Sequence, residues 1–206
     1  GGQANGSVNH TVNYNGLPES LDDIAQKVDE FGSTTAGTEY PNGWGQVSNT
    51  PFAMYKNSAF AAGTNTPLIV YHPKLIKDPG AIRNQYVHVS DITPTIYDVL
   101  GIKPPKEIGG IKQMAISGQS FKDSLTNANA KGKQTQYFEV SGHRAIYHDG
   151  WRAFTQHKKG DDFENDQWFL YHVAEDFSET NNLAEKYPKK LAEMQKLWQK
   201  EAEKYG

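Results

Sequence analysis

The chain has 206 residues, a formal net charge of -3 and no cysteine. The mild negative charge argues against a nucleic-acid-binding protein, and no apolar run is long enough to cross a membrane. The lack of cysteine excludes disulfides, thiolate metal sites and a cysteine nucleophile. The first ten residues have no initiator methionine and no basic-then-apolar signal pattern. We therefore expect Gly1 to follow an internal cut in a longer protein.

Residues 18–32, "PESLDDIAQKVDEFG", are predicted to form a helix. Apolar residues recur there at helical spacing, with Pro18 before the start and Gly32 after the end. The stripe consists of Leu21, Ile24, Ala25, Val28 and Phe31. Residues 33–50 are rich in Gly, Thr, Ser and Asn, and this composition predicts a long irregular loop of the kind that often lines a site.

The run "PLIVY", residues 67–71, is continuously apolar and predicts a central strand covered on both faces. The stretch "DITPTIYDVLGI" that starts at Asp91 predicts a helix, with Asp91 as its cap, Pro94 in its first turn and Gly101 at its end. His88 and Asp91 form the catalytic-looking string "HVSD". A structural role is favoured for both, since Asp91 suits a helix cap and His88 suits packing on the preceding strand.

Residues 103–129 are a loop-rich connection, and we place a boundary near its end, which divides the chain into residues 1–127 and 128–206. Beyond it, "TQYFEV", "HRAIYHDGWRAFTQ" and "QWFLYHV" predict strands, with a hairpin turn at Asp149–Gly150. The charged stretch "KKGDDFEND" predicts a solvated hairpin tip. The last residues predict a helix with one apolar side, made of Leu191, Met194, Leu197, Trp198 and Ala202.

Five stretches in collinear order resemble the C-terminal half of type I sulfatases, the arylsulfatase branch of the alkaline phosphatase superfamily. They are "GWGQVSNTPFAMYK", "GTNTPLIVYHP", "IRNQYVHVSDITPTIYDVLGI", "YFEVSGHRAIYHDGWRAFTQ" and "LYHVAEDFSETNNLAEKYPKKLAEMQKLW". The resemblance implies a fold of mixed α/β and α+β class. The remainder of an α/β/α sheet domain would be followed by a small antiparallel β-sheet subdomain with a packed C-terminal helix.

The resemblance implies a parent enzyme that hydrolyses sulfate esters with a formylglycine, made in a Cys/Ser-x-Pro/Ala-x-Arg motif, and with calcium. No such motif occurs in this sequence. The family's metal ligands would lie upstream of Gly1, so no metal is expected to bind here and the fragment is expected to be inactive alone. The implied partners are a sulfated small molecule or glycan and the missing N-terminal half. The parent is expected to be periplasmic or secreted.

Lys56 occupies the position of the family's sulfate-binding lysine, and the resemblance implies a catalytic, substrate-binding role for it. After Lys56 the family continues with a His-Glu pair, where this chain has Phe60-Ala61. His143, Asn9 and His10 are further candidates for substrate binding, with a surface or structural role as the alternative for each.

Glu139 and Arg144 lie where two strands meet, and they either form an ion pair or face the substrate. The family carries the same Gly-Trp pair as this chain, so Trp44 is predicted to be buried. For Tyr40, burial and stacking on a sugar both remain open.

Two other functions remain open from the sequence. The chain could be a binding module for sulfated or phosphorylated ligands, or part of a related phosphonate or phosphodiester hydrolase. As half of a larger domain, it is expected either to associate with another chain through residues 68–71 or to leave an apolar surface there. The helix that starts at Asp91 should cover one face of this segment and leave the other face bare.

Overall fold

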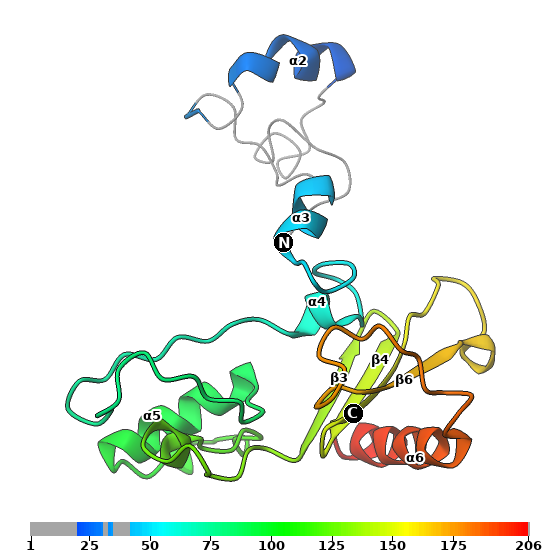
Figure 1. Cartoon of the computed structure of the whole chain (residues 1–206). Coiled ribbons are helices and arrows are strands. Elements are labelled where there is room, and N and C mark those ends of the chain that lie inside the picture. The colour runs from blue at the N-terminus through cyan, green and yellow to red at the C-terminus, as the bar shows by residue number, and fades with distance from the viewer. Residues whose placement is uncertain (1–19, 31–32, 35–41, 206) are drawn as a thin grey trace.

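The computed structural model describes residues 20–30, 33–34 and 42–205 (Figure 1). The helices are α2 (Leu21–Gln26), α3 (Asn42–Ser48), α4 (Ala61–Thr64), α5 (Ile92–Leu100) and α6 (Pro188–Tyr205). The strands are β1 (Glu107–Ile108), β2 (Ile111–Lys112), β3 (Thr135–Val140), β4 (His143–His148), β5 (Trp151–Thr155) and β6 (Trp168–His172). The short 3-10 turns are η1 (Val28–Glu30), η2 (Val89–Asp91), η3 (Lys122–Leu125) and η4 (Phe163–Asn165).

The C-terminal sheet is an antiparallel meander in the order β3-β4-β5-β6. Its β4–β5 turn is formed by Asp149 and Gly150, whose φ angles of 47° and 82° place both in the left-handed region that a tight hairpin turn requires. His148 pairs with Trp151 directly across this turn. The predicted antiparallel sheet and the predicted hairpin turn are therefore confirmed.

Each face of this sheet carries its own apolar cluster, because successive side chains of a strand point to opposite faces. On one face α6 packs against the strands, as Figure 1 shows. Its core is Ile146, Ala153, Leu170 and Met194, with Leu191, Leu197 and Trp198 packed around it. The opposite face is covered by the segment around α4, and its core is Ala59, Ala145, Phe154 and Tyr171. The predicted amphipathic helix is thus confirmed.

The predicted helix that follows Asp91 is also present, and it ends where Gly101 adopts a φ of 67°. Asp91 caps differently from the prediction. Its side chain makes no capping bond to α5 but accepts from the backbone N–H of His88 at 2.8 Å, which closes the preceding turn η2. His88 lies edge-on to the ring of Phe138, with centroids 5.3 Å apart. Both residues thus have structural contacts, but His88 packs on β3 and not on a strand that precedes the helix.

The predictions for residues 18–32, 33–50 and 67–71 differ from the structure. The predicted helix is shorter, with α2 ending at Gln26 and η1 following, and its predicted stripe leaves Val28 53% exposed. The predicted irregular loop contains the helix α3. Most importantly, residues 67–71 are extended but belong to no strand among the described residues. A strand needs a hydrogen-bonding neighbour, and the described part of the chain places none beside this segment.

Candidate functional site

Lys56 lies on an exposed turn between α3 and α4. Met54 and Asn57, on either side of it, have φ angles of 68° and 63°, which are uncommon for residues with a side chain. The Ser58 hydroxyl donates to the Tyr55 carbonyl at 2.8 Å and closes the turn. No residue in the described part of the chain forms an ion pair or hydrogen bond with the Lys56 side chain, so its charge faces solvent.

The segment before Lys56, here called the incoming side of the turn, is held by Gln46 of α3. The Gln46 amide donates to the Phe52 carbonyl at 2.9 Å and accepts from the Met54 N–H at 2.8 Å. The Phe52 ring also packs on Phe177, in the connection that follows β6, with centroids 4.8 Å apart. The turn is thus attached to two different elements before Lys56 is reached.

The segment after Lys56, here called the outgoing side, is held by Gln156, directly after β5, and by Glu179, in the connection after β6. The Ala59 N–H donates to Gln156 Oε1 at 2.8 Å, and the Ala61 N–H donates to Glu179 Oε2 at 3.0 Å. Gly63 closes onto Ser58 so tightly that a Cβ at this position would overlap the Ser58 carbonyl. This close approach requires glycine.

Phe60 and Ala61, which stand where the resemblance implies a His-Glu pair, pack into the apolar face of the sheet, with Phe60 half-buried and Ala61 buried. The Phe60 ring packs against Phe154 and Phe169 with centroids 4.9 and 6.0 Å away. Ala61 is 5% exposed. The departure from the family pattern is therefore accommodated by the apolar face of the sheet.

His143 is the first residue of β4. Its Nδ1 accepts from the His157 N–H at 3.0 Å, and its Nε2 lies 2.9 Å from the Gln156 amide nitrogen. Because Gln156 also accepts from Ala59, one side chain connects His143 to the outgoing side of the turn. Both ring nitrogens have partners inside the protein, an arrangement that favours a supporting role, while direct substrate contact stays a prediction.

The ion pair considered between Glu139 and Arg144 does not form, although the two residues face each other across β3 and β4. Arg144 pairs with Asp166 at 2.6 Å instead, and Glu139 accepts from the Gly142 N–H. Asp166 also lies 3.1 Å from His157 Nδ1 and is only 5% exposed. The stretch predicted as a solvated tip therefore has one end buried, a feature that its charged composition concealed.

The remaining candidates divide into two groups. Trp44 is 62% exposed, so its predicted burial is wrong for the described part of the chain. Asn9, His10 and Tyr40 lie outside the described residues.

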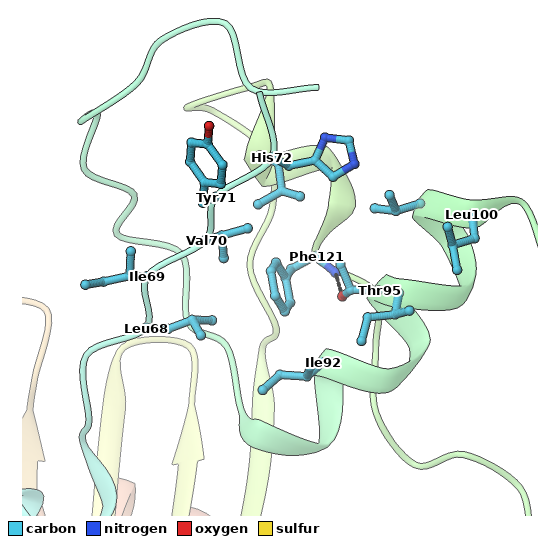
Figure 2. Close-up of a pocket in the computed structure, with 12 residues that line it drawn as sticks. Leu68, Ile69, Val70, Tyr71, His72, Ile92, Thr95, Leu100 and Phe121 are labelled. Carbon is cyan, nitrogen blue, oxygen red and sulfur yellow. Dashed lines mark hydrogen bonds between the residues drawn. The ribbon is translucent and has the colours of Figure 1, made fainter. Parts of the chain in front are cut away.

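An apolar groove of about 390 Å³ lies between α5 and the extended segment 68–72 (Figure 2). Figure 2 shows Leu68 and Val70 directed toward α5 and Phe121, whereas Ile69 and Tyr71 point away from it. Ile69 is 90% exposed and Tyr71 is 86% exposed. Leu68 and Val70, which face α5 across the groove, are also 47% and 39% exposed. The expected apolar surface is therefore confirmed, whereas the expected cover of one face by α5 is only partial.

Among the described residues, no group of three or more His, Cys, Asp or Glu side chains could hold a metal ion. The buried carboxylate of Asp91 already accepts from Lys133 Nζ, the Gln119 N–H and the His88 N–H, each at 2.8 Å. No helix in the described ranges combines the length and the apolar character needed to span a membrane.

Comparison with known proteins gives a consistent result. Residues 52–205 match the family described as N-sulphoglucosamine sulphohydrolase, C-terminal. An uncharacterized sulfatase of Schizosaccharomyces pombe is 27% identical over 198 residues, which cover 95% of this chain and 35% of that protein. The arylsulfatase of Klebsiella aerogenes is 28% identical over 109 residues, which cover 52% of this chain and 23% of that enzyme.

Two solved structures share the fold. One comes from work on glycosaminoglycan metabolism by Bacteroides thetaiotaomicron, with a TM-score of 0.54, 20% identity, and coverage of 70% of this chain and 30% of that one. The other is Ps i-CgsB in complex with k-i-k-neocarrahexaose, with a TM-score of 0.55, 18% identity, and coverage of 73% and 32%. The chain thus spans at most about a third of the length of these relatives, and its mixed helix and antiparallel-sheet architecture is that of a sulfatase C-terminal domain.

Proposed function

Because this chain belongs to the C-terminal family of N-sulphoglucosamine sulphohydrolase, we propose that it forms the C-terminal part of an enzyme that hydrolyses sulfate esters. The observation that carries the proposal is the extent of the family match, which begins at residue 52 and so takes in the Lys56 turn and the whole C-terminal sheet. The substrate class we propose is a sulfated small molecule or glycan.

In this proposal Lys56 binds a sulfate oxygen. Negative charge spreads over the sulfate and the leaving oxygen as the ester bond breaks, and a fixed cation beside it stabilises the transition state. The ammonium of lysine is a compact charge that suits this task. The structure supports the role because the turn is anchored on both sides while the Lys56 side chain has no protein partner among the described residues.

Calcium and formylglycine, which the resemblance implies, do not fit the residues present here. The sequence has no cysteine and no Cys/Ser-x-Pro/Ala-x-Arg motif, and the Asp91 carboxylate is fully used within the protein. The proposal assigns calcium and formylglycine to the preceding part of the polypeptide, which makes up the larger share of the relatives' length.

We infer that this preceding part also covers residues 68–71. The segment has the alternating orientation of a strand, apolar side chains on both faces and no strand neighbour among the described residues. An extended segment with free backbone groups and a bare apolar face is a template for pairing with another strand. The occupant that we propose is a strand of the upstream region, because the relatives are more than twice as long as this chain.

The 206-residue chain on its own is expected to associate in solution through this bare face, as measured by light scattering after gel filtration. Replacing Ile69 and Tyr71 with lysine should return it to monomer size, since two charges oppose pairing of the apolar face. The same double substitution in the full-length protein should instead reduce soluble folded protein. If the unmodified chain is monomeric at high concentration, or the full-length protein tolerates both lysines, this docking surface is contradicted.

The enzymatic proposal is tested with 4-nitrophenyl sulfate and calcium. We expect turnover by the full-length protein and none by the 206-residue chain, because the chain supplies a substrate-binding cation but no nucleophile motif. Bis(4-nitrophenyl) phosphate, run in parallel, separates a sulfatase from a phosphodiesterase. Faster hydrolysis of the phosphodiester by the full-length protein would show a phosphodiesterase in place of a sulfatase. Turnover that copurifies with the short chain would refute the proposal that the nucleophile lies in the preceding part of the polypeptide.

A further inference from the structure

Arg152 and Glu179 form a buried ion pair behind the Lys56 turn. Arg152 is on β5, and Glu179 is in the connection between β6 and α6. Arg152 Nη1 donates to Glu179 Oε1, and the two side chains are 6% and 4% exposed. The guanidinium also lies over the Phe154 ring, 4.7 Å from its centroid. Neither charge is therefore available to solvent.

Both members of the pair also bind the outgoing side of the Lys56 turn. Arg152 Nη2 donates to the Ala59 carbonyl and to the Thr64 hydroxyl, the latter at 3.2 Å. Glu179 Oε2 accepts from the Ala61 N–H at 3.0 Å. The planar fork of a guanidinium and the two oxygens of a carboxylate can each hold two partners in a fixed geometry. Here Arg152 binds Glu179 through Nη1 and the turn through Nη2, and Glu179 binds Arg152 through Oε1 and the turn through Oε2.

The turn needs such support because its own conformation is unfavourable. Met54 and Asn57 both occupy the left-handed region, and Glu179 does so too with a φ of 57°. Backbone of this kind persists only where the surroundings determine it, and such sites gather where function depends on position. A buried ion pair is in general poor evidence for stability, since its desolvation offsets its attraction, so a role in fixing geometry is the better account.

We propose that the Arg152–Glu179 pair is a positioning device that sets where Lys56 presents its charge. The two residues do not touch substrate; they act through the backbone of residues 59–64, which begins three residues after Lys56. The inference rests on the proposed function for the role of Lys56. It extends that function by making the C-terminal subdomain responsible for the placement of a catalytic group.

The test uses the full-length protein and 4-nitrophenyl sulfate, with four variants: Glu179→Ala, Glu179→Gln, Lys56→Ala and the double variant with alanine at both positions. A displacement of about 1 Å at a reacting group can cost about 10²-fold in rate, so Glu179→Ala should lower kcat/KM by about that factor. Glu179→Gln keeps an acceptor oxygen for the Ala61 N–H but not the negative charge opposite Arg152, so it should recover part of the loss. The double variant should be no slower than Lys56→Ala alone, because both changes remove one function.

A purely structural pair gives a different pattern. In that case the two losses multiply in the double variant, and glutamine rescues thermal stability without rescuing the rate; either result overturns the proposal. Glu193→Ala is the matched control, because it removes an exposed glutamate whose partner Lys190 lies on the same helix α6. This control should leave kcat/KM unchanged.

A second measurement does not depend on activity. Hydrogen exchange of the amides in residues 59–63 should accelerate in Glu179→Ala, less in Glu179→Gln and not in Glu193→Ala. Unchanged exchange in Glu179→Ala would show that the Arg152–Glu179 pair does not hold residues 59–63, and would refute the proposal. If the full-length protein hydrolyses no sulfate ester but the exchange result is as expected, the proposed function is refuted. The conclusion that the Arg152–Glu179 pair fixes the turn is then still supported.

Discussion

Replacing Lys56 with alanine in the full-length protein is expected to lower kcat/KM for an aryl sulfate by about 10²–10³, the usual loss when one preorganised group opposite developing charge is removed. The structure gives the reason for expecting a preorganised cation. The turn is attached to α3, to the connection after β6 and to β5, so the position of the Lys56 backbone is fixed. Steady-state kinetics with 4-nitrophenyl sulfate measure the effect.

The matched control is Lys103→Ala, which removes another exposed lysine, one that follows α5 and lies outside the Lys56 turn. This variant should behave as the unmodified protein. If Lys56→Ala changes both kcat and KM by less than about twofold, Lys56 is an ordinary surface lysine and the proposed role is excluded.

Replacing Lys133 with methionine is expected to destabilise the protein by about 3–5 kcal/mol at pH 7, because it leaves the buried charge of Asp91 without its counter-ion. Lys133 donates to Asp91 at 2.8 Å, and the two side chains are 12% and 1% exposed. Chemical unfolding of the variant and the unmodified chain measures the difference. Lys122→Met is the control, since its partner Asp98 is 47% exposed and pairs of this kind contribute about 1 kcal/mol or less.

The pH dependence of the Lys133→Met penalty shows whether the charge of Lys133 or its packing causes the loss of stability. Burial by itself raises the pKa of Asp91, but the hydrogen bonds from Lys133, Gln119 N–H and His88 N–H outweigh burial and hold the pKa below its ordinary value. A lowered pKa in the folded state means that this contribution is present above the unfolded-state pKa of about 4 and is lost as the pH falls through the folded-state value.

Nearby His88 has a pKa lowered by burial and by Lys133, so its protonation also opposes folding in acid. The penalty of Lys133→Met should therefore shrink between pH 7 and pH 3, as Asp91 takes up a proton and no longer needs a counter-ion. A penalty that is the same at both pH values would show that Lys133 contributes packing and not charge.

The sequence by itself determined the elements whose causes are local. The α6 helix follows from the spacing of Leu191, Met194 and Trp198, and the β4–β5 hairpin follows from Asp149–Gly150, because each requires only neighbours along the chain. The end of α5 at Gly101 has the same origin. The resemblance placed Lys56 at the site, and the structure shows it exposed on an anchored turn.

Only the tertiary structure decided the partners of the charged residues. Arg144 faces Glu139 in the strand register but pairs with Asp166, and Arg152 pairs with Glu179 from a separate connection. The ion-pair partners depend on which side chains are desolvated together, and the charged composition of the loop did not reveal that Asp166 is buried.

The environment of the apolar run 67–71 was also decided by the tertiary structure. The composition of this run predicted a central strand covered on both faces, but the segment pairs with no strand among the described residues and its side chains at 68–71 are all exposed. Burial requires neighbours, and within the described chain the groove beside this segment is bordered mainly by α5.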